Sequence, residues 1–132
     1  MEKVIKVAFS TADGELINTH FGYSNAFDIY QITKERYEKL ATRVIIDDGN
    51  NNESDRIEER LNLVIDCTLL FITQIGPTAA ARVTRNKIMP VKVKEDTSIK
   101  EQLERLLKML QTNPPLWLVK AMNDRTKEGR NS

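Results

Sequence analysis

The 132-residue chain carries 20 Lys and Arg against 19 Asp and Glu, which leaves a formal net charge of +1 at pH 7. With 40% hydrophobic and 30% charged residues, its composition is typical of one soluble globular domain. The near-neutral charge gives little long-range attraction to nucleic acid or acidic membranes, and no apolar run approaches the ~20 residues of a membrane span. We therefore expect no nucleic-acid partner and no membrane partner.

Hydrophobic periodicity and turn residues predict the elements of the fold. In chain order these are strands at 4–10, 26–32 and 37–46, a polar loop at 47–52, a helix through Val64, a strand at 69–73, a helix at 77–85, a strand at 88–93, and a helix from the Ser98–Glu101 capping box to 113–115. In the third strand, period-two spacing predicts one half-buried face. This face comprises Leu40, Thr42, Val44 and Ile46.

This order of elements indicates an α/β fold. A hairpin comes first, and the two strand–helix alternations that follow favour parallel pairing with right-handed crossovers. We expect a single domain with a mixed five-stranded sheet of order 3-2-1-4-5, in which strand two is antiparallel and helices pack on the sheet. Residues 1–113 form the main domain in this interpretation, and 114–132 form a short helix and a polar tail.

His20, the only histidine, is the first candidate for chemistry. It lies in the loop Thr19-His20-Phe21-Gly22 after the first strand, and imidazole is a common metal ligand. A solvated surface histidine explains the same position. Gly22 favours a binding loop, because glycine permits a close backbone approach or an unusual dihedral angle.

Cys67, the only cysteine, has two interpretations. A thiolate can ligate iron, whereas a free cysteine is more commonly a small buried hydrophobic residue. A lone cysteine cannot form an intramolecular disulfide, so we expect a reducing, cytoplasmic environment.

The turn at 76–81 (GPTAAA) is rich in small residues and opens a helix. Such a turn presents free N–H groups and the positive end of the helix dipole to an anion, although close packing of the helix on the sheet explains the same residues. Five positive charges follow without an acid among them, and they either attract an anionic ligand or form a solvated face. These are Arg82, Arg85, Lys87, Lys92 and Lys94.

Several enzyme signatures are missing from the sequence. The first strand has no carboxylate, which a two-metal nuclease would need, and no Walker, GxGxxG, GxSxG or CxxC motif occurs. One histidine with one cysteine cannot build a closed four-ligand metal site. A metal cluster held here must arrive assembled, so the residues favour a transient carrier over a redox protein. A protein-interaction module that acts through the Trp117 segment stays open.

The stretch 18–30 resembles the HFG…F-x-I-Y signature of the dinitrogenase iron–molybdenum cofactor biosynthesis family. Residues 67–83 look like that family's second signature, and 88–93 (IMPVKV) match the strand after it. The segment 114–122 is similar to the C-terminal ending of one branch of the family, so the resemblance covers about residues 4–123. One departure is the turn IGPTAAA, which has one glycine fewer than the IGGPAAA that the family often shows.

The resemblance implies a ribonuclease-H-like fold and a non-catalytic role in nitrogen fixation. Residues 1–113 would bind an anionic iron–sulfur precursor of the iron–molybdenum cofactor, supplied by a NifB-type protein, and pass it to NifE/NifN-type scaffold proteins. Apo-dinitrogenase is a further candidate partner. A module that regulates apo-nitrogenase or the scaffold without binding the cluster is the alternative. The expected cluster contacts are His20, Phe21, Gly22, Gly76, Pro77, Thr78 and Arg82, with His20 and Cys67 as metal ligands.

Overall fold

The computed structural model describes residues 4–46 and 52–131, with side chains described as far as residue 124. Its elements are β1 (Ile5–Ser10), β2 (Leu16–Ile17), the 3-10 helix η1 (Phe21–Tyr23), β3 (Ala26–Ile32), β4 (Tyr37–Val44), α1 (Glu53–Val64), β5 (Leu69–Ile72), α2 (Pro77–Arg85), β6 (Met89–Lys92), β7 (Thr97–Ser98), α3 (Ile99–Gln111) and α4 (Leu116–Asn131). No helix in these described ranges has the length and apolar character needed to cross a bilayer.

Five strands form one mixed sheet in the order β4-β3-β1-β5-β6, and β2 pairs separately with β7. β3 is antiparallel to β1 and β4, whereas β5 runs parallel to β1 and β6. The prediction of a single α/β domain with a mixed five-stranded sheet is confirmed. Strand β1 is central, and its C-terminal end lies beside that of β5.

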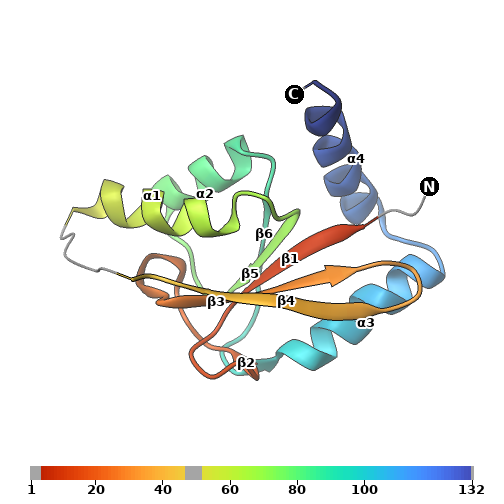
Figure 1. The fold of residues 1–132 in the computed structure, drawn as a ribbon, viewed down its shortest axis with the longest axis horizontal. Helices are drawn as coiled ribbons and strands as arrows, with labels where there is room; N and C mark the ends of the chain where they lie inside the picture. Colours follow the sequence, from red (N-terminus) through yellow and green to blue (C-terminus); the bar gives the residue numbers. More distant parts are fainter. Residues whose placement is uncertain (1–3, 47–51, 132) are drawn as a thin grey trace.

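Helices cover both faces of the main sheet (Figure 1). Helices α1 and α2 pack on one face together with Ala8 of β1, and α3 packs on the other with Val7 and Phe9. This alternation follows from the period-two geometry of a strand. Strand β5 is buried along its whole length, as expected of a continuous apolar strand covered on both faces.

The C-terminal segment forms a longer helix than the sequence predicts. A short helix with a polar tail is expected, but α4 continues to Asn131. Leu118, Ala121 and Met122 are buried in the core on the α3 side of the sheet. Figure 1 shows α4 at the end of the sheet where β1 begins. The segment therefore packs onto the domain at that end.

The predicted burial of one face of the third strand is wrong. β4 is an edge strand, and its apolar side chains are largely exposed: Leu40 by 42%, Val44 by 48% and Ile46, just beyond the strand, by 94%. The pairing with β3 skips Leu40, and such a bulge breaks the alternation on which the prediction depends. The loop expected at 47–52 lies outside the described residues except for Asn52, which caps α1.

Candidate ligand-binding site

His20 lies at the C-terminal edge of the central strands, on the loop that follows β1. It forms a parallel bridge with Gln74, which follows β5, and the N–H of Phe21 donates to the Gln74 carbonyl oxygen at 2.9 Å. In open α/β sheets, ligands bind in the crevice outside the carboxyl ends of the strands. The His20 side chain is exposed, so its imidazole is available to a ligand arriving from solvent.

A buried hydroxyl network holds the backbone directly before His20. The Thr19 carbonyl oxygen accepts hydrogen bonds from Ser10 Oγ at 3.2 Å and from Thr73 Oγ1 at 3.1 Å. The Thr19 hydroxyl pairs with Ser10 Oγ and lies 3.2 Å from Ser24 Oγ. Ser10, Ser24 and Thr73 are buried, and a fully satisfied buried network of this kind rigidifies a loop. Sequence reasoning missed these residues, although Ser10 and Thr73 both close apolar strands at the same edge.

Phe21 and Arg60 anchor the same loop from the side of α1. The Phe21 ring is fully buried, with its centroid 5.9 Å from that of Phe27. Arg60 of α1 is 1% exposed, and its Nε donates to the Ser24 carbonyl oxygen at 2.9 Å. Phe21 therefore supports the loop from inside the core. Arg60 was also missed, because an arginine on an amphipathic helix is ordinarily assigned to the solvated face.

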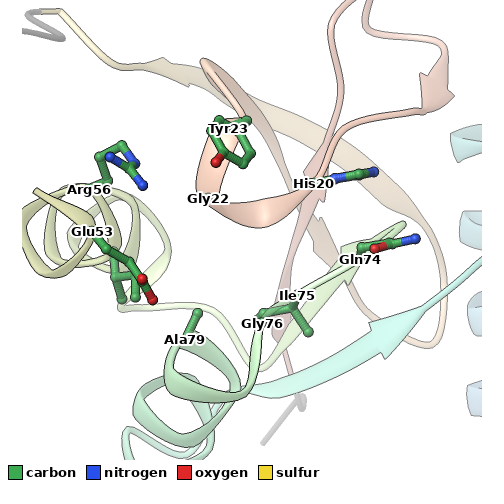
Figure 2. A pocket seen from close by; sticks show the side chains of 10 residues that line it. His20, Gly22, Tyr23, Glu53, Arg56, Gln74, Ile75, Gly76 and Ala79 are labelled. Carbon is green, nitrogen blue, oxygen red and sulfur yellow. The ribbon is translucent and has the colours of Figure 1, made fainter. Parts of the chain in front are cut away.

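His20 stands between two surface hollows, and Gln74 lines both of them. The first, of about 270 Å³, lies between η1, α1 and the start of α2, and the second, of about 440 Å³, lies against the end of β6. Figure 2 shows the side chains of His20 and Gln74 pointing in the same direction, away from Tyr23, Arg56 and Glu53 of the first hollow. In this conformation the imidazole is directed away from the first hollow.

The second hollow brings positive charge to the imidazole. Lys92 pairs with Ile72 in the parallel register of β5 and β6. The N–H of the next residue, Val93, donates to the Ile72 carbonyl oxygen at 2.9 Å, which keeps the chain beside the end of β5. Both lysines are exposed and line this hollow together with one acid, Glu95. The balance of charge favours an anion beside His20.

The first hollow contains the two glycines expected at the site, Gly22 and Gly76. Gly76 is the N-cap of α2 and offers no side-chain hydrogen bond, and Pro77 occupies the first turn. A Cβ built on either glycine meets nothing within 4 Å. The unusual dihedral angle considered for Gly22 is not found, because its φ lies outside the left-handed region. Each glycine instead leaves open space toward the hollow, next to the exposed Pro77 and Thr78.

The five positive charges predicted as a group are divided by the fold. Arg82 joins α2 to α1, since its guanidinium donates to Ser54 Oγ at 2.9 Å and lies 4.0 Å from a carboxylate oxygen of Glu58. Arg85 ends α2, at the opposite end of the helix from Gly76, and Lys87 follows it. Of the five, Lys92 and Lys94 line the hollow beside His20.

The structure does not bring Cys67 together with His20. Cys67 is fully buried and precedes β5, whereas the His20 loop meets the residues that follow β5. Cys67 and Gln74 lie at opposite ends of β5, roughly 20 Å apart, because an extended strand rises about 3.3 Å per residue. Burial, together with the neighbouring Asp66 carboxylate, raises the pKa of Cys67 to about 12. The neutral thiol packs as a small hydrophobic residue in the core between the sheet, α1 and α2.

We expect Cys67 to resist alkylation in the folded protein, because the reactive thiolate is nearly absent well below the raised pKa and the sulfur is buried. Mass spectrometry after iodoacetamide treatment at pH 8 should find an unmodified chain, and full modification in guanidinium. Rapid labelling of the native protein would contradict this assignment.

Together, the fold and the candidate site define a small α/β domain with an exposed imidazole at the carboxyl edge of its sheet. Residues 3–109 match the model of a family described as dinitrogenase iron-molybdenum cofactor. The chain belongs to this family.

Several relatives agree with that assignment, and one solved structure shares the fold. The chain is 34% identical to the NifX protein of Sinorhizobium fredii over 125 residues, which cover 89% of this chain and 78% of that protein. It is 31% identical to NifX of Herbaspirillum seropedicae, over 92% of this chain and 84% of that protein. It is 35% identical to NifY of Klebsiella pneumoniae, over 87% of this chain but 49% of that longer protein. A crystal structure of a putative dinitrogenase from Methanocaldococcus jannaschii shares the fold, with a TM-score of 0.54 at 19% identity over 80% of this chain and 90% of that one.

Proposed function

We propose that this chain is a non-catalytic cytoplasmic carrier in nitrogenase cofactor biosynthesis. It binds an iron–sulfur precursor of the iron–molybdenum cofactor, received from a NifB-type protein, and passes it to NifE/NifN-type scaffold proteins. Apo-dinitrogenase is a further candidate recipient. Family membership and similarity to NifX and NifY proteins support a role in the biosynthesis of this cofactor.

One observation carries the proposal: an exposed imidazole lies on a rigidly held loop between two hollows at the carboxyl edge of the sheet. A neutral imidazole nitrogen is a ligand for iron. The buried Thr19 carbonyl network holds the His20 backbone without using the imidazole, so the ring is available to the cargo.

The small number of donors suits cargo that arrives assembled. The whole chain has one histidine and one cysteine, and the cysteine lies in the core. We therefore propose His20 as the ligand from the protein, with Cys67 outside the ligand set. Lys92 and Lys94 stabilise the anionic cargo in the second hollow, and the Gly22 and Gly76 backbones leave the first hollow open on the other side of His20. Residues 1–113 form the binding domain, and 114–132 form a C-terminal segment appended to it.

The proposal is tested by isolating the protein anaerobically from cells that make the precursor. We expect brown protein with visible absorbance and a fixed number of irons per chain, and we expect the colour to be lost on mixing with the scaffold. Colourless, iron-free protein that also fails to take up the isolated precursor would refute the carrier function.

Reversing charge in the second hollow should weaken this binding. We expect Lys92→Glu/Lys94→Glu to lower the affinity for the isolated precursor about tenfold in low salt, and less at 0.5 M salt because charges at the surface are screened. The matched control is Lys100→Glu/Lys108→Glu, which makes the same charge change on exposed lysines of α3. Equal losses in both double variants would show that net charge alone is responsible.

A protein-interaction module is the second candidate, supported by exposed apolar side chains at the start of α4. Leu116 is 83% exposed and Trp117 is 37% exposed, at the end of the sheet away from His20. Leu116→Ser with Trp117→Ala should disturb partner binding in this case, and His20→Ala should leave partner binding unchanged. If the chain is a carrier, His20→Ala should instead weaken cluster uptake, and the double variant should retain it.

We also infer a ribonuclease-H-like topology. The observed strand order, counted along the chain within the main sheet, is 3-2-1-4-5 with the second strand antiparallel, and this supports the assignment. Nuclease chemistry does not follow, because β1 carries no carboxylate.

A further inference from the structure

We infer that Gln74 is a second cargo-contacting residue, whose side-chain amide N–H donates a hydrogen bond to a sulfide of the cluster held at His20. The inference rests on the proposed carrier function and deepens it. It assigns a role to a residue that the expected cluster contacts did not include.

Backbone pairing brings Gln74 beside His20. The two residues are partners in a parallel bridge, and paired residues in parallel strands project their side chains to the same side. Figure 2 shows this arrangement, with both side chains directed away from η1 and α1. Both residues line both hollows. A cluster bound by the imidazole would therefore lie within reach of the amide.

The chemistry of the amide suits the surface of a metal–sulfide cluster. Gln offers two N–H donors on a neutral side chain, and bridging sulfides are acceptors whose hydrogen bonds tune the reduction potential of a cluster. The Gln74 side chain is exposed, and no hydrogen-bond partner for it is found among residues 4–46 and 52–124. Its donors are therefore available to cargo.

The structural role of Gln74 is separate from this chemistry. The position supports the His20 loop through its backbone carbonyl, which accepts the Phe21 N–H at 2.9 Å. Any side chain at residue 74 retains that bond. A side-chain substitution therefore tests cargo contact without removing the support for the loop.

The test compares Gln74→Leu and Gln74→Glu with the natural chain, using the anaerobically isolated iron–sulfur precursor as the probe. Gln74→Leu removes the donor without adding charge and should weaken binding about three- to tenfold. Gln74→Glu replaces the donor by an anion and should weaken it further. The reduction potential of the bound cluster should fall in both variants, because N–H donation to sulfide stabilises the reduced, more negative state.

The matched control is Gln31→Leu on β3. Gln31 pairs with Lys6 near the start of β1, and its amide donates to Glu38 at 3.1 Å. This control should bind the precursor with the natural affinity and potential. Thermal unfolding should show both Gln74 variants folded, with a Tm near that of the natural chain.

Two outcomes separate the inference from the function on which it depends. If the natural chain takes up the precursor and Gln74→Leu matches it in affinity and potential, the Gln74 contact is overturned and the carrier function stands. If the natural chain takes up no precursor, both are overturned.

Discussion

His20→Ala should lower the affinity for the iron–sulfur precursor at least about 100-fold and leave the free energy of unfolding within about 0.5 kcal/mol. The binding loss is large because the imidazole is the proposed bond between protein and iron. The stability change is small because the side chain is exposed. The loop is held here by hydrogen bonds that the Thr19 carbonyl oxygen accepts and by one that the Phe21 N–H donates. Alanine at position 20 leaves all of these bonds in place.

Anaerobic titration with the isolated precursor measures the affinity, and urea unfolding of the apo-protein measures the free energy of unfolding. Asn25→Ala is the matched control, since Asn25 is exposed on the same loop and contributes its backbone carbonyl, which accepts the Ile45 N–H and is retained by alanine. A His20→Ala protein that binds the precursor with natural affinity would remove the imidazole from the site.

Much of the main sheet could be predicted because its strands carry local signals. The apolar runs at β1, β3 and β5 are long enough to show strand character, and α2 begins at its Gly-Pro turn as expected. The two-residue strands β2 and β7 were missed because a pair of residues shows no periodicity. The bulge at Leu40 was missed for a different reason: it depends on pairing with β3, which no local pattern encodes.

The candidate site was predictable where topology determines it. Loops that leave the carboxyl ends of adjacent parallel strands meet, so placing β1 beside β5 brings His20 and Gly76 to one hollow. The same reasoning separates Cys67 from them, because it precedes β5 while His20 follows β1. The hydroxyl network could not be predicted from the sequence, because Thr19 and Thr73 are 54 residues apart along the chain. They come together through the bridge between the residues that follow them, His20 and Gln74.

Phe21→Ala should have the reverse effect of His20→Ala, although the two positions are adjacent. Phe21 was predicted to contact cargo, but its ring is fully buried against Phe27 in the core between the sheet, α1 and α2. Truncating a buried phenylalanine costs about 3–5 kcal/mol through lost apolar burial and the cavity left behind. That is a large share of the roughly 5–15 kcal/mol that stabilises a domain of this kind.

Urea unfolding should show this loss, and Phe21→Leu should lose less, about 1–2 kcal/mol, because it retains much of the apolar volume. The leucine variant is the informative one for function, since it should be folded at 25 °C with the N–H of residue 21 still donating to the Gln74 carbonyl oxygen. It should therefore take up the precursor with nearly natural affinity. A folded Phe21→Leu protein that fails to bind would mean that the Phe21 ring leaves the core to contact cargo. The assignment of Phe21 to stability and His20 to cargo binding would then be wrong.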